Sequence, residues 1–173
     1  PWPRELLDVY RAYCALGTRE RLVMELCVGT GQRIGDVLTM RWSNIENGAV
    51  WVRQSKTSKE LWVPILPELQ AALDVASRHS VYILTNEQGT NRWSYRGASA
   101  AVRKVREQIG AVAYDIHSWR YNAACELLEA GCGDDLIAAV PSQSPAMVQH
   151  YTKKVRQRIR AVQAQQMRIG QRR

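Results

Sequence analysis

Five polar side chains in this sequence have the types and the local settings that chemistry at a phosphate group requires. Arg33 follows a glycine-containing turn at the start of an expected helix, where the helix N-terminus favours an anion and a guanidinium adds a planar fork of donors. His117 and Arg120 lie three residues apart at the start of another expected helix, so they share one face. Lys56 lies in a polar turn, and Tyr151 lies just before a basic tail. Each residue alone is also typical of a solvated or structural position, so their order along the chain carries the argument.

Four segments, in this order, resemble the sequence boxes of the tyrosine recombinases, the phage-integrase family. They are an arginine box at 29–38 continued at 41–45, a lysine-bearing hairpin at 54–60 with 63–65, a His-x-x-Arg box at 117–120 and a tyrosine box at 144–151. Each box alone is moderately specific, whereas four boxes in order at family-like separations are strongly specific. The resemblance covers about residues 18–152 and implies the family's catalytic fold.

The resemblance implies a role for each of the five side chains. Tyr151 attacks the scissile phosphate and leaves a 3′-phosphotyrosine and a free 5′-hydroxyl. Arg33 and Arg120 bind the non-bridging oxygens. Lys56 protonates the departing 5′-oxygen, and His117 assists proton transfer or donates a hydrogen bond to the phosphate.

General chemistry is consistent with these implied roles. The transition state of phosphoryl transfer places negative charge on the equatorial oxygens, which fixed cationic donors stabilise, and each arginine can make a bidentate contact. A phenol has an ordinary pKa of about 10, so Tyr151 needs such a cationic field or a base to lose its proton. The covalent intermediate keeps the bond energy, which allows rejoining without ATP.

The sequence contains no carboxylate cluster or His/Cys set typical of a metal site, so we predict no cofactor. Asp36 matches a family position that supports the site without reacting.

The tyrosine box departs from the family pattern at one position. The family usually has Leu-Gly-His there, and that histidine contacts the phosphate, whereas this chain reads Ala-Val-Pro-Ser-Gln at 139–143. Counting back from Tyr151 places Ser142 at the histidine position, and counting forward from Arg120 places Gln143 there. Both side chains can donate a hydrogen bond but neither can carry a proton charge. We therefore expect a slow but competent enzyme.

Composition excludes several classes of protein. The chain has 173 residues, 46% of them hydrophobic and 23% charged, which indicates a folded globular domain rather than a disordered, collagenous or disulfide-stapled chain. The net charge of +8 is concentrated at one end, because residues 153–173 hold eight basic residues and no acidic one, whereas residues 1–152 hold 16 of each sign. A basic tail on a neutral body favours a polyanionic partner, with a merely solubilising tail as the alternative.

Apolar spacing predicts a mainly α-helical fold with one small antiparallel β-sheet. Thr18 is expected to cap a buried helix that breaks at residues 29–31. Residues 50–52 and 61–65 read as the strands of a hairpin, and Pro64 marks the second as an edge strand. The remaining expectations are helices after Pro3, at 34–38, at 67–78 with Leu69, Leu73 and Val75 inward, at about 98–109, 118–130 and 144–151 and in the basic tail, a third strand at 81–84 and a polar loop at 85–97.

Three further basic residues in polar segments are predicted to bind DNA: Lys59 beside Lys56, and Arg92 and Arg96 in the loop. The four cysteines have no zinc-knuckle spacing and are predicted to be reduced and mostly buried.

We therefore expect residues 1–173 to be a single catalytic domain of a site-specific DNA recombinase, and specifically of a phage or mobile-element integrase. The family's N-terminal core-DNA-binding domain is expected to lie outside this chain. The expected partner is double-stranded DNA, and no association with a membrane is expected. The chain is expected to form a homotetramer on paired DNA sites and to be a monomer without DNA. Its expected location is the cytoplasm of a bacterial or phage-infected cell, associated with the nucleoid. The alternatives are a catalytically impaired DNA-binding module on the same fold, a type IB topoisomerase-like enzyme and a helical protein-interaction domain. Tyr121 and Tyr114 are the alternative nucleophiles.

Overall fold

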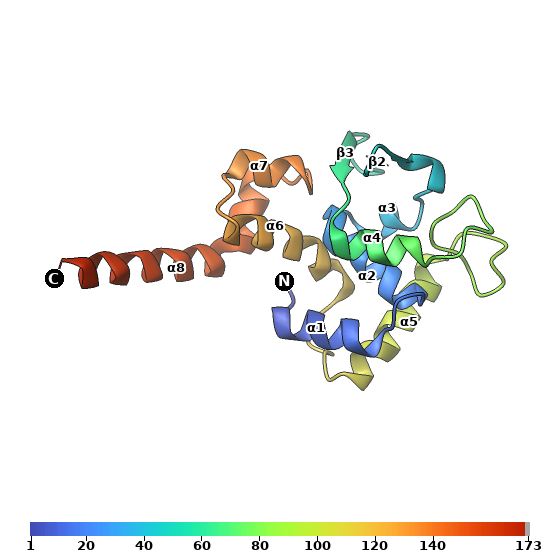
Figure 1. Cartoon of the computed structure of the whole chain (residues 1–173), viewed down its shortest axis with the longest axis horizontal. Coiled ribbons are helices and arrows are strands. Elements are labelled where there is room, and N and C mark those ends of the chain that lie inside the picture. The colour runs from blue at the N-terminus through green and yellow to red at the C-terminus, as the bar shows by residue number, and fades with distance from the viewer. Residues whose placement is uncertain (172–173) are drawn as a thin grey trace.

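Eight α-helices, two short 3-10 helices and three β-strands make up residues 1–171, the part of the chain that the computed structural model describes (Figure 1). In chain order they are α1 (Arg4–Tyr13), α2 (Arg19–Thr30), α3 (Ile34–Val37), η1 (Trp42–Asn44), β1 (Ile45–Glu46), β2 (Ala49–Arg53), β3 (Glu60–Pro64), α4 (Pro67–Asp74), α5 (Tyr95–Gln108), η2 (Ile116–Ser118), α6 (Trp119–Glu129), α7 (Asp134–Ala139) and α8 (Pro145–Gly170). This order confirms the predicted mainly helical class with a small antiparallel sheet.

Helix α2 is the central element of the domain, and α4 and α6 pack against it. Its N-terminus is capped as predicted, because the Thr18 side chain accepts a hydrogen bond from the backbone N–H of Arg21. The helix ends at Gly31, whose φ of 65° lies in the left-handed region. A Cβ at this position would lie 2.9 Å from the Cβ of Pro141, so glycine also permits the segment before α8 to approach closely.

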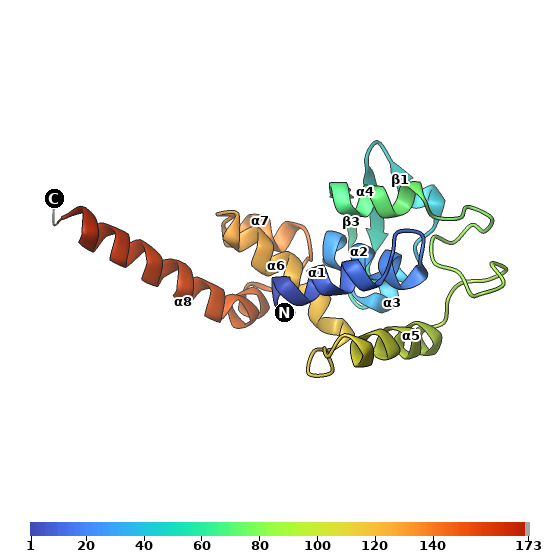
Figure 2. The same ribbon diagram turned by 60° about the horizontal axis from the view of Figure 1, so that its bottom comes forward.

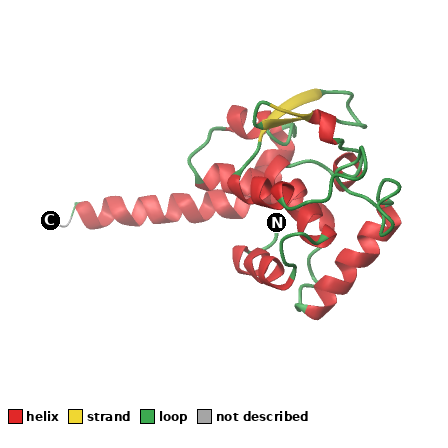
Figure 3. Cartoon of the chain, turned by 45° about the vertical axis from the view of Figure 1, so that its right-hand side comes forward, coloured by secondary structure: helices red, strands yellow, loops and turns green. Residues whose placement is uncertain are grey.

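The sheet has the order β1-β2-β3, with both pairs antiparallel, and lies at one edge of the helical body (Figure 3). Val50 pairs with Val63 and both are buried, whereas the next pair, Trp51 and Trp62, faces outward and is about half exposed. This alternation is the expected consequence of packing one face of a hairpin on the helices. Pro64 lies on edge strand β3 as predicted, and the two-residue strand β1 was not predicted.

Three predictions about the middle of the chain were wrong. Residues 81–84 form no strand, because a single bridge from Tyr82 to Arg41 is the only strand-like pairing that the structure describes there. Helix α4 ends at Asp74, which leaves Val75 outside it and 53% exposed rather than inward. Helix α5 begins at Tyr95, because the Ser94 side chain caps it, so residues 95–97 are helical and not part of the loop.

The C-terminal part differs from the prediction in two ways. Helix α7 was not predicted, and it packs with α6 and α8 around a small cluster of Ala124, Ile137 and Val148. Helix α8 is one continuous element rather than a tyrosine-box helix followed by a separate basic helix. Its C-terminal half extends away from the rest of the domain (Figures 1 and 2).

The four cysteines are free thiols, and all but the partly exposed Cys132 are buried, as predicted. Burial raises the pKa of Cys14 to about 11 and also raises the pKa of Cys27, which keeps both thiols protonated. Among residues 1–171, no helix combines the length and the apolar character that crossing a membrane requires.

Candidate active site

Arg33 is held at the start of α3 by the turn that ends α2. It is the N-cap residue of α3, and about one third of its side chain is exposed. Its Nη1 atom lies 3.9 Å from Oδ2 of Asp36, which is too far for a hydrogen bond, and has no hydrogen-bond partner among residues 1–171. The other carboxylate oxygen of the buried Asp36 accepts a 2.9 Å hydrogen bond from the backbone N–H of Ser55. Asp36 thus lies between Arg33 and the hairpin turn.

Arg120 lies in the first turn of α6 and is 8% exposed. Its Nη2 atom donates to the carbonyl of Pro141 at 2.6 Å, whereas its Nε atom is buried and makes no hydrogen bond within the described chain. Burial, and then the charge of Arg33, lower the pKa of Arg120 to about 10, so the guanidinium remains charged at neutral pH.

The two arginines therefore form a site with excess positive charge. They come from boxes almost 90 residues apart, yet they lie close enough for the charge of Arg33 to lower the pKa of Arg120. Each presents a buried donor that has no acceptor among residues 1–171, and the carboxylate of Asp36 partly offsets their charge. Buried unpaired donors and like charges are costly, and an anion with several oxygens relieves both costs at once. The arrangement is suited to bind a phosphate group.

Gln143 is the second group in this region with unmet hydrogen-bonding capacity. It is 9% exposed, and both Nε2 and Oε1 of its amide are buried without partners among residues 1–171. It lies two residues beyond the Pro141 carbonyl that Arg120 contacts. Ser142, between them, is partly exposed and has a φ of 49°, a left-handed conformation in which the chain turns sharply before α8.

Tyr151 lies in the second turn of α8 and is half-buried against α6. Its ring stacks on that of Tyr121, with centroids 3.4 Å apart and 15° between the ring planes. Tyr121 directly follows Arg120, so this stack brings the tyrosine box to the second arginine. Burial, and then the neighbouring Tyr151, raise the pKa of Tyr121 to about 12, while Arg120 acts in the opposite direction. The sequence had suggested Tyr121 only as an alternative nucleophile.

Lys56 and His117 lie at the surface rather than in this cluster. Lys56 is exposed in the turn between β2 and β3. The Nε2 atom of His117 lies 3.3 Å from the hydroxyl of Tyr95 at the start of α5, and the two rings are stacked with centroids 6.5 Å apart. His117 lies in η2 and is exposed, whereas Arg120 lies in the first turn of α6 and is buried.

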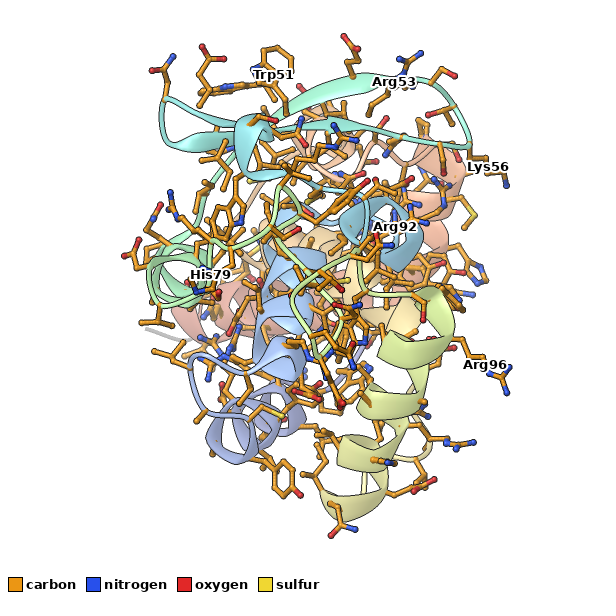
Figure 4. All side chains as sticks on the ribbon, turned by 90° about the vertical axis from the view of Figure 1, so that its right-hand side faces the viewer. Trp51, Arg53, Lys56, His79, Arg92 and Arg96 are labelled. Carbon is orange, nitrogen blue, oxygen red and sulfur yellow. The ribbon has the colours of Figure 1, made fainter. Side chains whose placement is uncertain are left out.

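The residues predicted to bind DNA are also exposed. Lys59 lies at the end of the hairpin turn, Arg92 in the loop before α5, and Arg96 in the first turn of α5. Figure 4 shows that Lys56 and Arg96 project to the same edge of the molecule, whereas Arg92 lies nearer the middle of the face in view.

Two buried glutamines complete the surroundings and were not singled out from the sequence. Gln32 precedes Arg33 and Gln54 precedes the hairpin turn, and each is 1% exposed. Their amides share a 2.7 Å hydrogen bond. One signal could have identified Gln54, because it continues the inward alternation of Val50 and Val52. Over residues 1–171, no three His, Cys, Asp or Glu side chains come together as a metal site would require.

Comparison with known proteins decides the family. Residues 3–158 match the phage integrase family, which is most of the chain. The chain belongs to the phage integrase family. Similar members include the integrase of Escherichia phage lambda, 42% identical over 67 residues that are 39% of this chain and 19% of that protein, and the integrase of Enterobacteria phage 434, 45% identical over 60 residues that are 35% of this chain and 17% of that protein. This integrase-family chain thus matches less than a fifth of the length of those curated relatives.

Solved structures place the fold of this phage integrase family member among tyrosine recombinase catalytic domains. A lambda integrase (75–356) dimer bound to a COC′ core site matches with a TM-score of 0.68 and 26% identity, over 85% of this chain and 56% of that one. The lambda integrase catalytic core matches with a TM-score of 0.65 and 27% identity, over 79% of this chain and 90% of that one. XerH bound to a palindromic difH substrate matches with a TM-score of 0.71 over 94% of this chain and 52% of that one, although its 16% identity supports the fold alone. The predicted family and fold are confirmed.

Proposed function

We propose that this chain is the catalytic domain of a site-specific DNA recombinase, an integrase that cleaves and rejoins DNA through a 3′-phosphotyrosine intermediate without a metal or other cofactor. The observation that carries the proposal is the pair of arginines with buried, unpaired donors beside the Tyr121–Tyr151 stack. Family membership supports the same activity.

Each group has one task in the proposed reaction. The Tyr151 oxygen gives its proton to water or to His117 and bonds to phosphorus, and the bond from phosphorus to the 5′-oxygen breaks. Arg33 and Arg120 stabilise the charge on the non-bridging oxygens, and Gln143 or Ser142 contributes a neutral donor. Lys56 gives its proton to the departing 5′-oxygen. Attack of a 5′-hydroxyl on the phosphotyrosine reverses these steps and rejoins the strand.

DNA is proposed to complete the site by lying between the buried arginines and the exposed groups. A duplex whose phosphate binds Arg33 and Arg120 brings its backbone within reach of Lys56 and His117. Lys59, Arg92 and Arg96 are proposed to bind flanking phosphates, so affinity falls as salt rises. His117 then contacts the scissile phosphate after leaving Tyr95.

The partners and the cellular setting follow from the same proposal. The similar structures include lambda integrase bound to DNA and a lambda integrase tetramer bound to a Holliday junction. We propose double-stranded DNA as the partner, a homotetramer on paired sites, a monomer without DNA, and action on nucleoid DNA in the cytoplasm of a bacterial or phage-infected cell. We also propose that residues 1–173 are one catalytic domain and that a separate domain provides the core-DNA-binding function.

Experiments can distinguish the proposed activity from two alternatives, a DNA-binding module and a topoisomerase-like enzyme. The departure from histidine at Ser142 or Gln143 favours a DNA-binding module that no longer cleaves. A type IB topoisomerase-like enzyme would use the same groups but would relax supercoiled plasmids that lack any recombination site.

A nicked suicide substrate tests the proposal, because the short released fragment, which carries the free 5′-hydroxyl, diffuses away and leaves the covalent intermediate trapped. We expect the chain to form a protein–DNA adduct that Tyr151→Phe abolishes while DNA binding stays nearly intact. Tyr13→Phe is the matched control, since Tyr13 is 56% exposed on α1. An adduct that survives Tyr151→Phe would assign the nucleophile to Tyr121 or Tyr114, and absence of any adduct on cognate sites would favour the binding module.

A further inference from the structure

The side-chain amide of Gln54 connects three segments that carry different parts of the site. Its Oε1 accepts a 2.7 Å hydrogen bond from the Thr57 hydroxyl in the hairpin turn. Its Nε2 donates to Oε1 of Gln32 at 2.7 Å and to the carbonyl of Pro141 at 3.3 Å. The side chain is 1% exposed and its polar atoms are all paired, so its orientation is fixed in a way that an exposed amide is not.

Gln32 extends this connection into the segment before α8. Its Nε2 donates to the carbonyls of Thr30 at 2.9 Å and of Val140 at 3.0 Å. The two amides therefore contact consecutive carbonyls, those of Val140 and Pro141, and Arg120 contacts the second of them. The arginine box, the hairpin and the segment that leads to Gln143 are thus joined at one buried point.

The position of Lys56 depends on hydrogen bonds to both of its neighbours, Ser55 and Thr57. The backbone N–H of Ser55 is bound by Asp36 at 2.9 Å, and the hydroxyl of Thr57 is bound by Gln54. The backbone of Gln54 also closes the turn, because its N–H donates to Lys59 and its carbonyl accepts from Ser58. The exposed Lys56 is therefore placed by the residues that flank it.

We propose that Gln54 is a positioning residue that holds the Lys56 turn in register with the Pro141 segment, and so aligns the acid with the arginine pair and the tyrosine helix. This inference rests on the proposed function, because it assigns Lys56 as the acid. The simpler account is that the amide pair only stabilises the fold, and the two accounts differ in which reaction step a variant impairs.

The test compares two suicide substrates that differ in the leaving group. A substrate with a 5′-sulfur at the scissile bond leaves as a thiolate and needs no proton from an acid, so loss of the acid does not slow it. Gln54→Met keeps the side-chain volume and removes all three hydrogen bonds. We expect it to slow cleavage of the 5′-oxygen substrate about tenfold to a hundredfold, as for a misplaced catalytic group, and to cleave the 5′-sulfur substrate at nearly the wild-type rate.

Thr57→Val is the second variant, and it is safe for folding because Thr57 is exposed. It removes only the hydrogen bond from the Thr57 hydroxyl to Gln54. We therefore expect the cleavage rate to fall only about threefold on the 5′-oxygen substrate and not at all on the 5′-sulfur substrate. Gln70→Met is the matched control, because Gln70 is exposed on α4 and its amide donates to Asp74 on the same helix. It should leave both rates unchanged.

Lys56→Ala separates the two levels of the proposal. If the 5′-sulfur substrate rescues Lys56→Ala but neither Gln54→Met nor Thr57→Val, the positioning role of Gln54 is wrong and the acid role of Lys56 stands. If it fails to rescue Lys56→Ala, the acid assignment is wrong and the inference falls with it. Equal slowing of both substrates by Gln54→Met, with Thr57→Val unchanged on both, would leave Gln54 a purely structural residue.

Discussion

The ring of Tyr151 lies flat against the ring of Tyr121, with 3.4 Å between their centroids. Tyr121 is covalently next to Arg120, which in turn binds the carbonyl of Pro141 at 2.6 Å. Tyr151, the proposed nucleophile, thus packs on a side chain from the helix that carries Arg120. We expect Tyr121 to support Tyr151 through this ring stack rather than through its hydroxyl.

Substitution of Tyr121 separates these two features. Tyr121→Phe keeps the stack, so we expect adduct formation at near the wild-type rate. Tyr121→Ala removes it, and adduct formation should fall about threefold to tenfold, the factor expected for an aromatic pair. The rates are measured with the nicked substrate by gel. An unchanged or faster rate for Tyr121→Ala would show that the stack does not assist the nucleophile.

The arginine pair should dominate the cleavage rate. Arg33→Ala and Arg120→Ala are each expected to slow cleavage at least about a hundredfold, the usual loss for one donor to a developing oxyanion. Arg103→Ala is the control, because Arg103 is exposed on α5 and pairs with Glu107. Single-turnover rates at saturating protein give the comparison. Losses as small as that of the control would remove the pair from the reacting phosphate.

The unpaired amide of Gln143 gives the segment before α8 a testable role. Gln143→His restores the donor usual in the family and should keep or raise the cleavage rate, whereas Gln143→Ala should lower it, because a neutral donor contributes about half as much as a charge-assisted one. Ser142→His tests the other alignment in the same assay, although its φ of 49° disfavours most side chains. If all three variants cleave at the wild-type rate, the segment does not line the site.

The basic end of α8 should act in assembly more than in folding. Deletion after Thr152 removes the contacts of Arg156 with Asp134 and of Arg158 with Glu129, which are ion pairs near the surface and stabilise the fold little. We expect a small fall in thermal stability and a large fall in assembly on paired DNA sites, measured by native gel.

Deletion after Arg160 refines this test, because it keeps both ion pairs and removes the exposed end of the helix. It should leave the thermal midpoint unchanged and still weaken assembly. A truncated protein that assembles normally on paired sites would show that this part of α8 has no role there.

Much of the local structure could be predicted because its causes lie close together in the sequence. Thr18 caps α2 with its own side chain, and Gly31 ends α2 through its own backbone conformation. The hairpin register follows from alternation within two short strands. The same holds for the order of the four boxes, which indicated the family before any packing was known.

Packing decided what the local pattern left open. Val75 and residues 81–84 are apolar, but the first lies beyond the end of α4 and the second finds only one bridge partner, so neither became what its pattern favoured. Helix α7 is six residues long, too short for a clear helical period, and its burial depends on α6 and α8. Apolar character shows that a residue can be buried but not which segment covers it.

The candidate site shows the same division. The sequence alone determined the residue types and their order, and therefore the family and the chemistry proposed for Arg33, Lys56, His117, Arg120 and Tyr151. Only the tertiary structure showed that Arg120 is buried beside Arg33, that Tyr151 stacks on Tyr121, and that Gln54 and Gln32 join the hairpin to the Pro141 segment. The reason is physical: hydrogen bonds and charge interactions between residues distant in the chain depend on how the helices pack, and a cost such as an unpaired buried donor exists only after water has been excluded.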